Sequence, residues 1–214
     1  MAKPKVHIYS LSRLAFADVT DWQAILKELQ EGRKSMYWSY KPLREGALQM
    51  ATRKNPDTKA IYTAVANLAE QSGGARCRKA NLAALEVFEK TFLPRIERVK
   101  SNFMVGSEHP VEFGKVQLVG GPHFSVIDAA HRERYIYLHP SKWEHEQVMA
   151  FCELLTVVAE EKYQSEARNV WFLDLRNGQD VPWPNSRKLV RRKCERAAEL
   201  LVAFRAADLA KDES

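Results

Sequence analysis

The stretch GGPHFSVIDAAHRERYIYLHP, residues 120–140, carries the sequence pattern that most strongly indicates the fold. It holds two runs of alternating, β-branched and aromatic residues, HFSVID at 123–128 and RYIYLH at 134–139, separated by a polar turn. This pattern is typical of antiparallel strands. The preceding segment VEFGKVQLV, residues 111–119, has the same texture. We therefore predict an antiparallel meander that begins near Phe103.

The segment after the meander predicts a buried helix and a further strand. Ser141 and Glu144 have the spacing of a capping box, and residues 147–159 are almost all apolar. NVWFLDL, residues 169–175, predicts a strand that ends at an Asn177-Gly178 turn. The expected fold is therefore α/β: a central mixed sheet built from residues 103–138 and 169–175, with the 141–163 helix packed on it.

The first half of the chain predicts helices. Thr20 or Asp21 can cap a helix that runs through Arg33, and Asp57 can cap another that stops at Gly73-Gly74. A third helix follows the glycines and ends near Pro94. We expect a single domain over 1–214, in which 1–100 is mainly helical and 101–210 is an α/β core with a basic C-terminal helix.

Composition narrows the class of protein. The chain has 214 residues, 45% of them hydrophobic, so it can bury a sizeable core. No run is long enough to span a bilayer and no signal peptide opens the sequence, so we expect a cytoplasmic protein without a membrane partner. The three cysteines lack CxxC spacing, which indicates neither a disulfide framework nor a cysteine zinc site.

The positive charge of the chain is concentrated near its C-terminus. The net charge is +6, and residues 187–196 hold six basic residues and one acid. In the predicted helix from Arg187 to Leu209, an apolar stripe lies opposite the basic side chains. This arrangement predicts contacts with a DNA or RNA backbone. The candidate nucleic-acid-binding residues are Lys188, Arg191, Arg192 and Arg196.

Several local strings resemble the RecB-like branch of the PD-(D/E)XK nuclease superfamily. YSLSRL at 9–14 is similar to the Ser-x-Ser-x-Leu string of that branch, and Glu112 to the glutamate before its first core strand. GGPHFSV at 120–126 is similar to its G-x-P-D turn, and QVMAFCELL at 147–155 to its Gln-x-x-x-Tyr helix. The resemblance implies a restriction-endonuclease-like core over about residues 103–185.

The resemblance also implies a metal site, and here the sequence departs from the family. The family needs an aspartate at the first motif and an acid-x-lysine on the next strand, where the carboxylates hold Mg²⁺. This chain has His123, Tyr137 and His139 at those positions, and Phe151 replaces the tyrosine after Gln147. In another register Gln117 takes the place of the aspartate, which still supplies no carboxylate.

We therefore expect a catalytically lapsed nuclease-like protein, without a cofactor, that binds nucleic acid or a complex that processes it. Two alternatives stay open. The first is an active Mg²⁺-dependent nuclease whose ligands have moved, with Glu112, Asp128, His123 and His139 as the fallback set. The second is a subunit that docks a protein partner in the former active-site groove. Separately, an aromatic and basic segment could stack bases. Its residues are Arg33, Lys34, Tyr37, Trp38, Tyr40 and Lys41.

Overall fold

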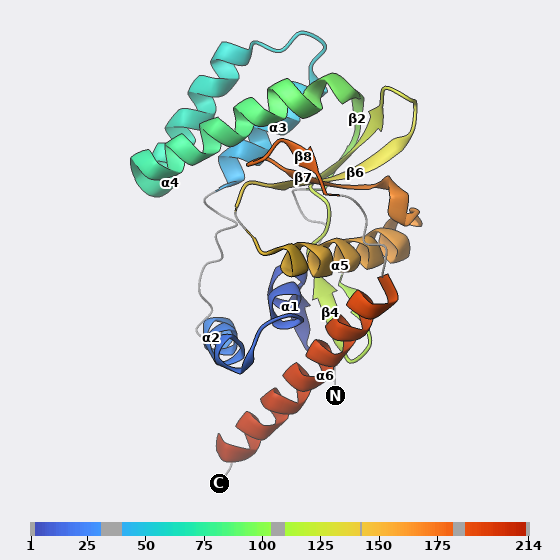
Figure 1. Cartoon of the computed structure of the whole chain (residues 1–214). Coiled ribbons are helices and arrows are strands. Elements are labelled where there is room, and N and C mark those ends of the chain that lie inside the picture. The colour runs from blue at the N-terminus through green and yellow to red at the C-terminus, as the bar shows by residue number, and fades with distance from the viewer. Residues whose placement is uncertain (1–2, 31–39, 104–109, 142, 182–186, 213–214) are drawn as a thin grey trace.

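The computed structural model describes residues 3–30, 40–103, 110–141, 143–181 and 187–212. Within them the chain forms an α/β structure with a helical N-terminal half and two mixed sheets (Figure 1). The α/β class and the helical first half are therefore confirmed. No helix in this part of the chain combines the length and the apolar character that crossing a bilayer requires.

The central sheet has five strands in the order β2-β5-β6-β7-β8. Strand β5 pairs antiparallel with both β2 and β6, β7 runs parallel to β6, and β8 is antiparallel to β7. The parallel pair needs a crossover connection, which is the helix α5. The bounds are β2 (Ile96–Asn102), β5 (Phe124–Asp128), β6 (Glu133–His139), α5 (His145–Tyr163), β7 (Val170–Asp174) and β8 (Gln179–Asp180).

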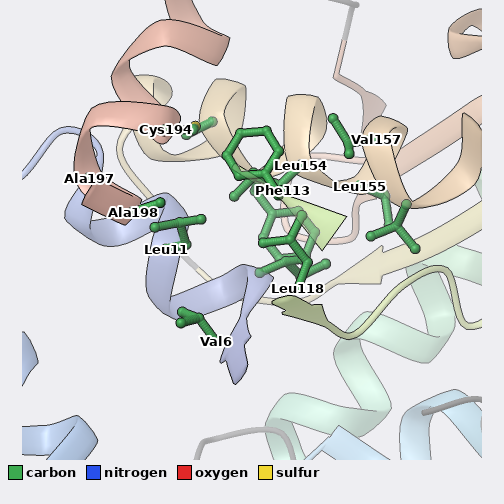
Figure 2. Close-up of a cluster of buried hydrophobic side chains, with 14 of the residues drawn as sticks. Val6, Leu11, Phe113, Leu118, Leu154, Leu155, Val157, Cys194, Ala197 and Ala198 are labelled. Atoms are coloured by element: carbon green, nitrogen blue, oxygen red, sulfur yellow. The ribbon is translucent and has the colours of Figure 1, made fainter. Parts of the chain in front are cut away.

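The segment 111–119 lies outside the central sheet, so this part of the sheet prediction was wrong. It forms β3 (Val111–Phe113) and β4 (Val116–Val119), and β4 pairs with β1 (Lys5–His7) in a separate three-stranded sheet. The apolar face of this hairpin packs in the core that α5 shares with the termini of the chain (Figure 2). The third strand of the meander is β2, whose sequence IERVKSN is too polar to signal a strand.

Helices cover both faces of the central sheet (Figure 1). The helices α3 (Lys41–Thr52) and α4 (Thr58–Val87) pack on the face that carries Phe124, Ile136 and Leu138. The opposite face packs on α5, whose residues 150–159 are all buried. This confirms the predicted buried helix. The chain thus has two apolar cores, one on each side of the sheet.

The remaining helices lie beyond α5. Helix α1 (Ile8–Leu14) contacts α5 and leads to α2 (Val19–Gln30). The last helix, α6 (Arg187–Asp212), packs on α5 and α1 through the predicted apolar stripe. Its buried side chains are Val190, Cys194, Ala197, Ala198 and Leu201. Phe204, which the stripe pattern also included, is 37% exposed.

Two helix starts differ from the sequence prediction. Helix α5 begins at His145 with Glu144 as its N-cap residue, so Ser141 and Glu144 form no capping box, and Ser141 instead lies in a pocket wall. Asp18, rather than Thr20 or Asp21, caps α2 by accepting a hydrogen bond of 2.8 Å from the Asp21 backbone. Asp57 caps α4 as predicted, and the backbone leaves helical geometry at Gly73 and Gly74, so the predicted stop there and the further helix after the glycines are confirmed.

Candidate functional site

A pocket of about 290 Å³ opens at the end of the central sheet where β5 begins and β6 ends. Its wall is mostly aromatic and imidazole side chains, together with one arginine. The described lining residues are His7, Tyr9, Ser10, Leu29, Tyr40, Arg44, His123, Tyr137, Leu138, His139, Pro140, Ser141 and Trp143. The wall therefore joins the start of the chain, the α3 region and the motif strands.

The three motif positions named from the sequence meet in this pocket. Strands β5 and β6 are antiparallel with Phe124 opposite Ile136, so His123 and Tyr137 lie side by side on the α5 face. Their rings stack with centroids 4.4 Å apart. His139 follows two residues after Tyr137 on the same face, and its ring lies 4.2 Å from that of Trp143. The favoured register therefore places all three residues at one site.

His123 is held as a neutral imidazole. It is 5% exposed, and burial lowers its pKa well below the ordinary value, with the nearby charge of Arg44 acting in the same direction. The Leu138 backbone N–H donates a hydrogen bond of 3.2 Å to His123 Nδ1. Because Nδ1 accepts, the neutral ring carries its proton on Nε2. That buried Nε2 has no partner among the described residues.

His139 is also neutral but has the opposite tautomer. Burial lowers its pKa to about 4, although Asp174 and a hydrogen bond to the Ser141 backbone act in the other direction. A backbone hydrogen bond that raises the pKa of an imidazole is one in which the ring donates, and the acceptor is a carbonyl oxygen. His139 Nε2 is buried without a partner in the described chain, so Nδ1 is the donor. The neutral ring then presents an unprotonated Nε2.

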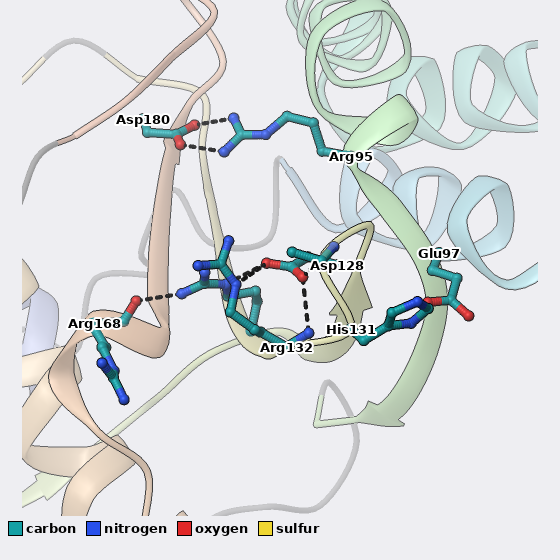
Figure 3. A network of polar contacts seen from close by, with 9 residues as sticks. Arg95, Glu97, Asp128, His131, Arg132, Arg168 and Asp180 are labelled. Carbon is teal, nitrogen blue, oxygen red and sulfur yellow. Dashed lines mark hydrogen bonds and ion pairs between the residues drawn. The ribbon is translucent and has the colours of Figure 1, made fainter.

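The carboxylates of the fallback set do not reach the pocket. Glu112 is exposed on β3 and pairs with Lys3 at 2.5 Å. Asp128 lies at the far end of β5 from His123, about 17 Å away at 3.3 Å per residue. There its side chain accepts hydrogen bonds from the backbone of Ala130 and Arg132 and from the Arg134 guanidinium (Figure 3). Burial by itself raises the pKa of Asp128, but these partners together outweigh it and lower the pKa to about 2, so the ionised side chain stabilises the 128–132 turn.

The pocket does not suit Mg²⁺. Mg²⁺ requires hard oxygen ligands, mainly carboxylates, in octahedral geometry. The described lining residues offer imidazoles, phenols, hydroxyls and one arginine, whose charge repels a cation. Within the described ranges, no three His, Cys, Asp or Glu side chains are grouped so as to hold a metal ion. The donor set thus disagrees with the ion that the family resemblance implies.

Other residues named from the sequence lie near the pocket or elsewhere. Gln147 is half-buried in the first turn of α5 and does not line the pocket. Phe151 is fully buried, with its ring centroid 4.5 Å from that of Tyr137. Within the aromatic and basic segment 33–41, Tyr40 lines the pocket, and the part from Arg33 to Trp38 lies outside the described residues.

Sequence reasoning missed how His7, Arg44 and Trp143 contribute to the pocket. His7 ends β1, Arg44 lies in the first turn of α3, and Trp143 precedes α5. These residues converge because of how α1 and α3 pack around the sheet, and no local sequence pattern predicts that packing. The one available signal was the YSLSRL string, which places Tyr9 and Ser10 in the same wall.

The basic residues of α6 fall into two groups. Lys188, Arg192 and Arg196 are exposed. Arg191 instead pairs with Glu195 at 3.5 Å and lies over the Phe113 ring, so it is less suited to contact phosphates. Arg187 at the start of the helix bonds Glu153 and Glu160 of α5. Lys193 is also exposed, but it lies over the Phe16 ring at 4.1 Å from the centroid. Within residues 187–196, the exposed cations with neither an ion pair nor a ring contact to a described residue are therefore Lys188, Arg192 and Arg196.

Comparison of the chain with models of known protein families, with curated proteins and with solved structures finds no match.

Proposed function

We propose that the protein is a catalytically lapsed nuclease-like protein that binds nucleic acid. One observation carries the proposal. The three positions that the resemblance assigns to the metal-binding carboxylates and the lysine do lie together, and they line a largely aromatic pocket in which His123 and His139 are neutral. The arrangement of an active site is kept, while its donors suit a neutral ligand.

The order of elements supports a restriction-endonuclease-like core. An antiparallel meander, β2-β5-β6, is followed by the buried helix α5 and by β7, which is parallel to β6. This is the order of helices, meander, buried helix and strand on which the resemblance rests. Because a fold hosts many functions, the proposal depends on the site rather than on the order.

The donor set supports the loss of catalysis. In the family, carboxylates and Mg²⁺ activate a water and stabilise the charge that develops on phosphate. A histidine with a pKa near 4, such as His139, is uncharged at neutral pH and supplies neither a carboxylate nor the positive charge of lysine. Glu112 and Asp128 are engaged in other contacts far from the pocket.

Helix α6 supports binding of nucleic acid. Lys188, Arg192 and Arg196 are spaced four residues apart, so they form one row on the solvent side of the helix. The row lies toward the C-terminal end of α5, since Arg187 bonds Glu160 there, while Trp143 and the pocket lie at the N-terminal end. A strand that contacts both would therefore run along the length of α5.

Three exposed side chains on α6 favour a second candidate, docking of a protein partner at α6 rather than in the former active-site groove. Leu189, Leu200 and Phe204 are 58%, 48% and 37% exposed. Large apolar residues mixed with arginine are typical of the centre of protein interfaces.

The test is binding of labelled single-stranded DNA, duplex DNA and single-stranded RNA to the full chain at low salt, measured by fluorescence anisotropy. The proposal expects saturable binding of at least one of them that weakens as salt rises. Absence of binding to all three at low salt would contradict it and favour the partner-docking function.

A further inference from the structure

We infer that the pocket binds one nucleobase, which His123 and His139 recognise through a paired donor and acceptor. The inference assigns a ligand to the site of the proposed function and rests on that function, because the base is expected to arrive on a nucleic-acid strand. A free nucleoside offers the same chemistry and is the other source of such a ligand.

Two imidazole nitrogen atoms in the pocket wall lack a hydrogen-bond partner among the described residues. His123 is 5% exposed and His139 is 4% exposed, and in each ring Nε2 is buried without a partner in the described residues. A buried polar atom without a hydrogen bond is costly, so both atoms are suited to a ligand that satisfies them. His123 Nε2 offers a donor because its Nδ1 accepts from Leu138.

The two Nε2 atoms have complementary hydrogen-bonding roles, one as a donor and the other as an acceptor. We assign the proton of the neutral His139 ring to Nδ1, because the Ser141 backbone favours a donor there and Nε2 is buried without a partner in the described residues, so Nε2 offers an acceptor. Each nucleobase carries an acceptor next to an N–H donor on its pairing edge: N1 and N6 of adenine, N3 and N4 of cytosine, and O6 or O4 beside a ring N–H in guanine, thymine and uracil. The two histidines offer the complementary donor and acceptor without selecting one base.

The size and polarity of the pocket suit a single nucleobase. A volume of about 290 Å³ lies at the small end of ligand pockets, which suits one ring system rather than a chain segment. Tyr9, Tyr40 and Trp143 supply aromatic faces on which a base can stack. Burial keeps both histidines neutral, and a neutral ring enters such a site at a lower desolvation cost than a phosphate.

Arg44 fits the same ligand. It lines the pocket, is 4% exposed, and its charge acts on His123. A positive charge at the wall attracts the strand that carries the base, and its face can stack on a base. The alternative ligand is an inorganic anion bound at Arg44, and the experiment tests it with inorganic phosphate.

The experiment compares a single strand of about ten nucleotides with a strand of the same length in which every sugar is abasic. Affinities for the full chain are measured by anisotropy, and free nucleosides and inorganic phosphate are tested as competitors. For the unmodified protein we expect the abasic strand to bind about tenfold more weakly, the size of one stacked base. Phosphate should compete no better than expected from its effect on ionic strength.

The variants remove only the two buried Nε2 atoms. His123→Asn keeps an acceptor near the position of Nδ1 for the Leu138 N–H and removes the Nε2 donor, and His139→Asn keeps the donor to Ser141. Each variant should bind the normal strand about as weakly as the abasic one and bind the abasic strand unchanged. His123→Gln, which returns an amide near Nε2, should restore part of the difference. His131→Asn, at an exposed turn histidine, is the matched control.

The outcomes separate this inference from the proposed function. Equal binding of the normal and abasic strands by the unmodified protein would overturn the base pocket and leave nucleic-acid binding standing. Competition by phosphate alone, at constant ionic strength, would also overturn it. Binding of a nucleoside that depends on His123, without binding of any strand, would support the pocket and contradict the proposed function. If neither strand nor nucleoside binds at low salt, both are wrong.

Discussion

The Leu138 backbone N–H donates a hydrogen bond of 3.2 Å to Nδ1 of His123. At this end of the sheet, the side chain of one strand thus satisfies a backbone group of its neighbour, just after the last regular β5–β6 pair, Phe124 with Ile136. The contact ties the residue at the first motif position to the strand that carries the other two. It also fixes the tautomer of His123, on which the chemistry of the pocket depends.

The first prediction concerns the salt dependence of nucleic-acid binding. Changing Lys188, Arg192 and Arg196 to alanine removes about three phosphate contacts. Each contact contributes about 0.9 to the slope of log affinity against log salt on duplex DNA, so the slope should become shallower by about 2.7. The control triple variant changes Arg53, Lys54 and Lys59, which are exposed around the α3–α4 connection, and should leave the slope unchanged. Equal slopes for the wild type and the α6 variant would remove α6 from the binding surface.

The second prediction concerns stability in acid. His139 has a pKa of about 4 in the native state and about 6.5 when unfolded, so between these values the unfolded chain binds the proton and the native chain does not. The free energy of unfolding should therefore fall as pH drops from 6.5 to 4. His139 alone contributes a loss of about 2 to 3 kcal/mol between pH 7.5 and 4.5. His123 acts in the same direction.

Urea unfolding of the wild type and of His139→Asn at the two pH values measures this. The difference between pH 7.5 and 4.5 should be about 2 to 3 kcal/mol smaller in the variant. The groups that act on the two rings are Arg44, His7 and Asp174. Asp128, with a pKa of about 2, titrates below this window. An identical pH difference in the wild type and His139→Asn would show that His139 is not held neutral.

The third prediction concerns the ion pair that joins α5 to α6. Glu153 is fully buried, and its carboxylate accepts a hydrogen bond of 2.8 Å from Arg187 Nε. Arg187→Ala leaves this carboxylate buried without its partner and should lower the free energy of unfolding by about 3 to 5 kcal/mol. Adding Glu153→Leu should recover much of the loss.

The control for that pair is Arg78, which bonds Glu70 at 3.0 Å with both side chains about half exposed. Arg78→Ala should cost less than about 1 kcal/mol, because an exposed pair is screened by water and salt. If urea unfolding gave equal losses for Arg78→Ala and Arg187→Ala, the buried pair would not hold α6 against α5.

The sequence predicts elements whose signal is local. Residues 147–159 of α5 are almost continuously apolar, and the α6 stripe has a clear helical period, so both helices were found. The predicted Asn177-Gly178 turn is also present, with Gly178 at a φ of 64° between β7 and β8. The local composition and the spacing of apolar residues indicate these features, and neither depends on how distant segments pair.

The parts that were missed depend on pairing between distant segments. β2 lies at the edge of the sheet with alternate polar residues exposed, so its sequence carries little apolar signal. The 111–119 hairpin has the alternation of a strand, but alternation does not say which sheet a strand joins, and β1, more than 100 residues earlier, is its partner. The contribution of His7 and Arg44 to the pocket was missed for the same reason, because it depends on contacts between distant segments.

We propose that the protein binds a nucleic-acid strand at a site that no longer cleaves it. The direct measurement follows one end-labelled single strand on a denaturing gel, with Mg²⁺ or Mn²⁺ present and protein at a concentration that anisotropy shows to be saturating. The account predicts a fully bound and intact strand with either ion. Cleavage that requires the ion and disappears on Glu112→Ala or Asp128→Ala would contradict it, and would identify a nuclease with relocated ligands.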